Sequence, residues 1–196
     1  MTKLTAIAER NPLGRRALRE RGLTLVELMV GVALLAVAMA IAAPEFGRWG
    51  RATRVMTHAS DLQSALAYAR SESSRRGVRV TVCRSAAPMA AVPSCDATAT
   101  WAAGWLVFVD NVHLAGNAPG VVDGADTVLR IGEPALNSVI ATTGNLGAWL
   151  AYSPQGLVRS VAGPATGAFT VCQAPHARRI AVSPVGLIAL TTEVCS

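Results

Sequence analysis

The feature that most constrains this chain is a run of 21 residues, 23–43, that is apolar except for Thr24 and Glu27. An α-helix of that length measures about 30 Å, enough to cross the hydrocarbon of a bilayer. A carboxylate at the bilayer centre costs about 2.5–3.5 kcal/mol, but Glu27 lies one turn inside the run and calls for a partner. The sequence therefore predicts a single transmembrane helix at residues 23–43.

The segment before this run is basic, and it is interpreted as a cytoplasmic leader, residues 1–22. Its basic residues are Lys3, Arg10, Arg15, Arg16, Arg19 and Arg21. Positive charge on one flank of a span holds that flank in the cytoplasm, so everything after Ala43 is expected outside. Two alternatives stay open: a secretory signal with a cleavage box at residues 38–40, and a plain anchor with Glu27 reaching the interface.

Charge and length bound the rest of the chain. The net charge is +6, but residues 1–22 hold six basic and two acidic residues, so their removal leaves +2. The basic balance is therefore weak evidence for a nucleic-acid partner. About 150 of the 196 residues follow the span, which is the size of one domain.

Apolar periodicity extends the helix beyond the span. One face carries apolar and small residues in steps of four and three: Val55, Ala59, Leu62, Leu66, Ala69 and Ser73. Pro44 removes one backbone donor and should bend the helix without ending it. The pattern predicts one helix from about Thr24 to Arg76, with an extramembrane half in residues 44–77 that ends at Gly77.

The remainder, residues 78–196, has the composition of a β-rich domain. Strands are expected at 78–82, 105–109, 127–131, 138–142, 148–152, 157–161, 168–173, 178–182 and 187–190. The pattern A-x-S-P-x-G-L occurs at 151–157 and again at 181–187. Ser-Pro-x-Gly suits a β-turn, so each copy is interpreted as a hairpin. A long helix packed on antiparallel sheet is an α+β fold.

The residues around the start of the span resemble the signal of type IV prepilins and type II secretion pseudopilins. Gly22-Leu23-Thr24-Leu25-Val26-Glu27 opens an uninterrupted apolar helix. The resemblance implies cleavage after Gly22 by the prepilin peptidase and N-methylation of the new terminal residue, Leu23. It further implies that Glu27 meets the terminal ammonium of a neighbouring subunit, which supplies the partner that this carboxylate needs.

Downstream blocks resemble the GspH/FimT family of minor pseudopilins and minor pilins. They are residues 69–72, 78–83, 104–110, 126–130 and 179–186. The resemblance implies a pilin-like fold and a single-pass protein of the bacterial inner membrane with a periplasmic C-terminal domain. Its implied partners are other minor pilins or pseudopilins, the major subunit, the prepilin peptidase/methyltransferase and membrane lipid. The secretion and pilus systems are not distinguished.

No pattern indicates catalysis or a cofactor. His58, His113 and His176 are far apart and belong to no nucleophile or metal motif, so neither an enzyme nor a metal site is expected. Clustered oxygens at Asp110, Asn111, Asp123 and Asp126 leave calcium as an alternative. Loop capping by Asp and Asn explains them about as well.

The four cysteines, Cys83, Cys95, Cys172 and Cys195, all follow the span. An even number in an oxidising compartment favours two disulfides. Near-neighbour pairing would join Cys83 to Cys95 and Cys172 to Cys195, although three connectivities are possible.

A basic run raises a DNA alternative. It comprises Arg48, Arg51, Arg54, Arg70, Arg75, Arg76, Arg79 and Arg84. Such a face can be solvated near anionic lipid or can contact phosphates of DNA. Some FimT-type members act in DNA uptake through a segment of G-R-x-R type near the C-terminus. Residues 186–189 read Gly-Leu-Ile-Ala here, so DNA contact would fall to Arg178 and Arg179 and is the less favoured function.

Overall fold

A computed structural model describes residues 22–195, with the side chains of residues 42–46 left undescribed. Of the predicted leader, residues 1–22, all but Gly22 lie outside the described residues. The contacts of the chain divide it into two units at Ala43 and Pro44, and each unit is described by itself below.

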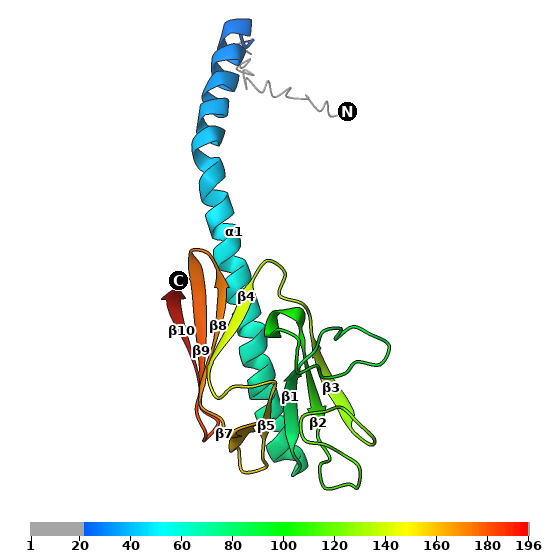
Figure 1. Ribbon diagram of the computed structural model, residues 1–196. Helices are drawn as coiled ribbons and strands as arrows, with labels where there is room; N and C mark the ends of the chain where they lie inside the picture. The colour runs from blue at the N-terminus through cyan, green and yellow to red at the C-terminus, as the bar shows by residue number, and fades with distance from the viewer. Residues whose placement is uncertain (1–21, 196) are drawn as a thin grey trace, which may run out of the picture. The chain divides into compact units, whose positions relative to one another are not determined.

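Helix α1 spans Leu25–Arg76, which confirms the single long helix predicted from the sequence (Figure 1). Arg75 and Arg76 lie in its last turn, where positive charge complements the helix dipole. Gly77 follows with φ of 69°, and its N–H donates to the carbonyl of Ser73 over 3.0 Å. A left-handed glycine of this kind is a common end to a helix because it lacks a Cβ.

The β-strands form two antiparallel sheets that flank the C-terminal half of α1 (Figure 1). The six-stranded sheet has the order β3-β2-β1-β5-β6-β7, and the four-stranded sheet the order β10-β9-β8-β4. The first consists of β3 (Thr127–Gly132), β2 (Trp105–Val109), β1 (Val80–Arg84), β5 (Trp149–Tyr152), β6 (Val158–Ser160) and β7 (Gly163–Pro164). The second consists of β10 (Ile188–Val194), β9 (His176–Val182), β8 (Gly167–Gln173) and β4 (Val139–Gly144). A short 3-10 helix, η1 (Trp101–Ala103), precedes β2.

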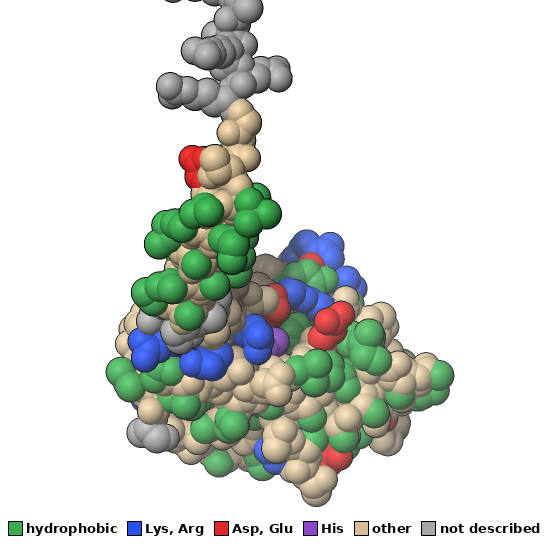
Figure 2. All heavy atoms as spheres, turned by 90° about the horizontal axis from the view of Figure 1, so that it is seen from above, with side chains coloured by type: hydrophobic (Ala, Val, Ile, Leu, Met, Phe, Trp, Pro, Cys, Tyr) green, Lys and Arg blue, Asp and Glu red, His purple; other side chains and the backbone are tan. Residues whose placement is uncertain are grey.

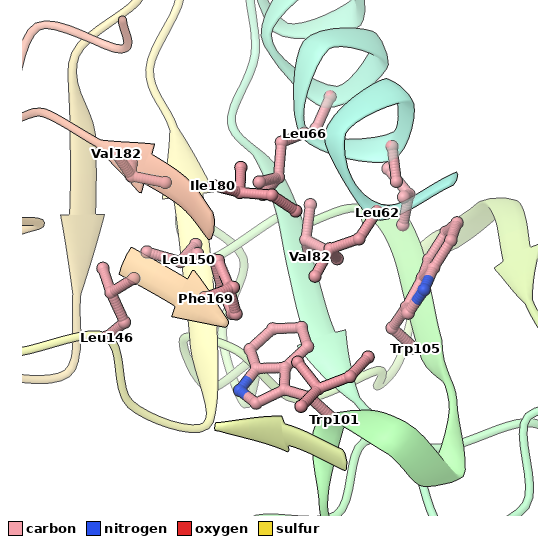
Figure 3. Packing of buried hydrophobic residues seen from close by; sticks show 14 of the residues in the cluster. Leu62, Leu66, Val82, Trp101, Trp105, Leu146, Leu150, Phe169, Ile180 and Val182 are labelled. Atoms are coloured by element: carbon pink, nitrogen blue, oxygen red, sulfur yellow. The ribbon is translucent and has the colours of Figure 1, made fainter. Parts of the chain in front are cut away.

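The apolar stripe of α1 fills the space between the sheets (Figure 3). Leu62 and Leu66 are fully buried there, against side chains from both sheets such as Val82 and Ile180. The ring of Trp101 meets that of Phe169 edge to face, with centroids 4.9 Å apart. The predicted stripe is confirmed, and because it contacts both sheets, α1 joins them into one core.

Strand β1 differs from the expectation of a half-buried strand. Four of its five residues are buried, because β1 pairs with β2 on one side and β5 on the other and is covered on both faces. The face away from the main core carries a second cluster of Cys83, Leu106 and Phe108. The alternation with polar residues suggested that one face of β1 is exposed, but Thr81 is buried. Its hydroxyl is satisfied there, because it donates to Asp110 Oδ2 over 2.6 Å.

The two A-x-S-P-x-G-L segments form the predicted hairpin turns, one between β5 and β6 and one between β9 and β10. In each turn the glycine N–H, of Gly156 or Gly186, donates to the serine carbonyl three residues earlier, at 2.8 and 2.9 Å. Their φ angles are 79° and 75°, a conformation that favours glycine. The turns lie side by side, since a Cβ on Gly186 would fall 2.3 Å from the carbonyl oxygen of Gly156.

Candidate functional site

The start of α1 carries the residues expected to be processed. Gly22, Leu23 and Thr24 precede the helix, and Gly22 and Leu23 are exposed. Thr24 Oγ1 accepts a hydrogen bond from the backbone N–H of Glu27 over 3.2 Å, and the Thr24 carbonyl accepts from Leu28 N–H over 3.1 Å. Thr24 thus caps the first turn. The Gly22–Leu23 bond therefore lies in accessible, non-helical chain directly before a capped helix.

The spacing of Thr24 and Glu27 is itself a helix-start signal. Thr-x-x-Glu at the first turn is the capping-box pattern, and a carboxylate there also complements the positive end of the helix dipole. The side chain of Glu27 is exposed and takes part in none of the ion pairs of residues 22–195. The signal for the cap was present in the spacing of Thr24 and Glu27.

The first seventeen residues of α1, 25–41, present their apolar side chains outward. The large apolar side chains from Leu23 to Ile41 are between 53% and 75% exposed. Within the part of the chain that the structure describes, no helix combines the length and the apolar character needed to cross a membrane. The predicted span, 23–43, extends by two residues into the segment whose side chains are not described.

Both cysteine pairs are disulfide-bonded, in the near-neighbour pattern. Cys83 on β1 is joined to Cys95 with a Cα–Cα distance of 5.7 Å, and Cys172 on β8 to Cys195 with 5.6 Å. The first bond holds the loop after β1 against the second apolar cluster. The second attaches the residue after β10 to the same sheet.

The acidic residues considered for calcium hold a loop together instead. Asp110 Oδ2 accepts from Gly120 N–H over 3.0 Å and lies 3.1 Å from Arg79 Nε. Asp126 Oδ1 accepts from the backbone N–H of Asn111 over 2.8 Å, and Asp123 Oδ2 from that of residue 118 over 2.8 Å. Among the described residues, no three acidic, histidine or cysteine side chains are grouped so that they could hold a metal. Their observed contacts fit loop capping.

Arg178 and Arg179, the residues proposed for DNA contact, are neighbours on β9. Successive side chains of a strand point to opposite faces, so the two do not form one patch. Arg178 Nη1 donates to the hydroxyl of Thr192, and Arg179 Nη1 lies 3.7 Å from Glu193 Oε1. Both partners belong to β10, which pairs with β9.

The three histidines remain separate: His58 lies on α1, His176 on β9 and His113 in the loop between β2 and β3. His58 instead borders a groove of about 330 Å³ with Asp61, Arg130 and Glu133. Arg130 Nη1 donates to the hydroxyl of Ser64 on α1 over 3.0 Å. The sequence could not group these residues, because His58 and Arg130 are 72 positions apart.

Arg70, which the sequence placed on a solvated face, holds both hairpin turns. Its Nη1 and Nη2 donate to the carbonyls of Gly186 and Val185 over 2.9 and 3.2 Å. A Cβ on Gly156 would fall 3.1 Å from its Nε, so the guanidinium lies against the first turn as well. The backbone also bridges the sheets here, since Val158 N–H donates to the carbonyl of residue 184 over 2.9 Å.

The last two turns of α1 contain a compact ion cluster. Glu72 lies 2.7 Å from Arg75 Nη2 and 2.6 Å from Arg76 Nε. Hydrogen bonds from Arg75 and Arg76 lower the pKa of Glu72 to about 2. Burial, by contrast, raises the pKa of Tyr152 in the neighbouring core.

Comparison with known proteins agrees with both the N-terminal segment and the domain. Residues 18–43 match the Prokaryotic N-terminal methylation motif, and residues 58–186 match the family described as Type II transport protein GspH. A methylation motif followed by an α+β domain of this kind defines a type IV prepilin-like protein. The second match covers well over half of the chain, and the chain belongs to the GspH family. No curated protein sequence matches it.

Two solved structures have a similar fold, and both are crystal structures of the type IV minor pilin FimU of Pseudomonas aeruginosa, strain PAO1. The form in space group P65 is 19% identical to this chain, with a TM-score of 0.50, and the match covers 72% of this chain and 99% of that FimU chain. The form in space group P21 is 18% identical with a TM-score of 0.52, and covers 74% and 96%. The likeness confirms the predicted pilin-like α+β fold.

Proposed function

We propose that this chain is a minor pilin or pseudopilin that is processed after Gly22, N-methylated at Leu23 and anchored in the inner membrane by residues 23–43. The domain of residues 44–196 then lies in the periplasm. From the membrane the subunit assembles, with other minor subunits and the major subunit, into the tip of a type II secretion pseudopilus or a type IV pilus.

The observation that carries this proposal is the start of α1. Gly22 and Leu23 are exposed and non-helical, and Thr24 begins the helix immediately after them. A peptidase requires an accessible bond outside regular structure, and the Gly22–Leu23 bond lies at the boundary between the basic leader and the apolar run. Glu27, one turn further on, is exposed and available to the ammonium of a neighbouring subunit.

DNA uptake is the alternative function, and the arrangement of the domain gives it less support. Residues 45–196 contain 12 basic and 9 acidic residues, a net charge of +3. Arg178 and Arg179 point to opposite faces of β9 and each has a partner on β10. At physiological salt we expect this domain to bind DNA only non-specifically, with a dissociation constant of about 10⁻⁴ M or weaker.

Processing tests the proposed function. When the full chain is expressed with a prepilin peptidase, intact-mass and N-terminal analysis should find a chain that starts at N-methylated Leu23. Glu27→Leu should be processed and inserted equally, because it makes the span more apolar, but should no longer co-purify with filament subunits. A chain starting near Ile41 or Ala43 would instead identify a conventional secretory signal and refute the proposal.

A further inference from the structure

Residues 48–54 of α1 combine three arginines and one exposed tryptophan just after the predicted span. Arg48 and Arg54 are exposed, Arg51 is half-buried, and Trp49 is 71% exposed. Glu45 is the single acidic residue between 28 and 60 in the sequence, so this segment has a net positive charge. Basic residues normally concentrate on the cytoplasmic flank of a span, so three of them on the opposite flank require a local reason.

Arg51 and Arg54 extend toward the N-terminal end of the helix, each beside a glycine one turn earlier. A Cβ on Gly47 would lie 3.9 Å from Arg51 Nη1, and a Cβ on Gly50 would lie 3.9 Å from Arg54 Nη2. Each glycine is four residues before its arginine, so each guanidinium extends back by one turn. Gly47 follows Ala43 by four residues, which is about 6 Å of helix and comparable to the thickness of one headgroup layer.

Arg51 and Arg54 differ from the arginines near the C-terminal end of α1 in their contacts. Arg51 and Arg54 form no hydrogen bond or ion pair with any group in residues 22–195. Arg75 and Arg76, by contrast, are both bound to Glu72, and Arg79 to Asp110. Figure 2 shows Lys and Arg side chains gathered on the face of the molecule seen from above. Arg51 Nε is buried, so it is the terminal nitrogens of Arg51 and the guanidinium of Arg54 that are available to acceptors outside the chain.

We infer that Arg48, Trp49, Arg51 and Arg54 form a basic collar that binds anionic phospholipid headgroups on the periplasmic surface of the membrane. The inference rests on the proposed anchoring of residues 23–43. Guanidinium groups pair with lipid phosphates, and an indole ring with an apolar body and one N–H donor suits the membrane interface. Each basic residue near an anionic surface strengthens association about fivefold, so the collar should prefer anionic over zwitterionic lipid.

The collar can be tested through Trp49 in the full chain. The protein is placed in nanodiscs of phosphatidylcholine and phosphatidylglycerol, with a nitroxide near the glycerol of one lipid or the other. The fluorescence of Trp49 is obtained by subtracting the signal of Trp49→Phe from that of the wild type. The subtraction removes the signal of the three other tryptophans. Quenching should be several-fold stronger with labelled phosphatidylglycerol. The basic leader faces the other leaflet and does not affect this reading.

Matched variants separate the collar from general charge. Arg48→Gln, Arg51→Gln and Arg54→Gln together should bring the two quenching values to equality. Arg159→Gln, Arg178→Gln and Arg179→Gln together remove the same charge from the β-strands and should leave the preference intact. Equal quenching by both lipids in the wild type would overturn the inference while leaving the anchor in place.

Two other outcomes are informative. A chain that alkaline carbonate releases from membranes would refute the anchor, and with it the proposed function. A collar variant that keeps its lipid preference but no longer enters filaments would assign these residues to contact with a neighbouring subunit and overturn the inference.

Discussion

Residues 25–41 and residues 55–73 belong to the same helix, α1, but expose their apolar side chains to opposite extents. In the first segment the large apolar side chains are all more than half exposed. In the second, Val55, Leu62 and Leu66 are at most 1% exposed. Apart from Glu27, the first segment is apolar around its whole circumference, whereas the second is apolar on one face, as expected for a helix that packs on one side only.

The second segment also differs in how its polar residues are used. Ser73 lies on the buried stripe, and its hydroxyl hydrogen-bonds to the carbonyls of Val78 and Tyr152 at 2.7 and 2.9 Å. Arg70 and Glu72, off the stripe, bind the hairpin turns and the last turn of the helix. The C-terminal half of α1 is therefore specified by both packing and hydrogen bonds. Residues 25–41 are distinguished by their apolar composition instead, so their function depends on the environment around them.

The largest expected contrast is between two leucines of this helix. Leu66→Ala should lower the free energy of unfolding by about 3 kcal/mol, because it removes buried methyl groups and leaves a cavity between the sheets. Leu35→Ala, the same change in the exposed half, should alter the unfolding of the domain by less than about 0.5 kcal/mol. Urea unfolding of both full-length variants in detergent micelles measures the difference. Equal losses would show that the exposed half contributes to the fold of the domain.

A smaller effect is expected at Arg70. Arg70→Ala should destabilise the domain by about 1.5 kcal/mol, since two backbone carbonyls lose a charged donor. Arg70→Lys should recover only part of this, because an ammonium lacks the planar fork that reaches both carbonyls. Hydrogen exchange should rise at the amides of Gly156 and Gly186. Arg159→Ala, at an exposed arginine of β6, is the control, and a similar change there would argue against the bridging role.

The smallest effect is pH-dependent and concerns Glu72. Its pKa is lowered to about 2, so its charge stabilises the folded state above the ordinary pKa of 4.5, and this contribution is lost as the pH falls toward 2. Glu72→Gln should therefore have a lower melting temperature than the wild type at pH 7, and the same melting temperature as the wild type near pH 2. Thermal unfolding followed by circular dichroism measures this. The exposed Glu133→Gln should show no such convergence, and a Glu72→Gln deficit that persists at pH 2 would contradict the ion cluster.

Several elements could be predicted because their signals are local. The helix from Thr24 to Arg76 follows from apolar spacing and the glycine at its end, and strand Trp105–Val109 agrees with its prediction residue for residue. Both Ser-Pro-x-Gly turns formed as expected. Each of these depends on neighbours within about seven residues, where side-chain type and backbone geometry are directly linked.

The elements that were not predicted depend on distant parts of the chain. The burial of β1 on both faces requires the loops after β1 and β2 to cover the side away from α1. The contact between the hairpin turns joins segments 30 residues apart in sequence, and Arg70 reaches them from 115 and 116 residues away. No periodicity in a single segment encodes such a contact.

The sequence alone determined the apolar run, the basic segment before it, the match of residues 18–43 to the methylation motif, and the long helix with its one apolar face. These are properties of consecutive residues and helical repeats, so they need no knowledge of the rest of the chain. Only the tertiary structure decided the order of the strands, the joining of two sheets by α1, and the role of Arg70. Those features depend on which distant surfaces meet, because buried side chains are chosen by complementary packing across the whole domain.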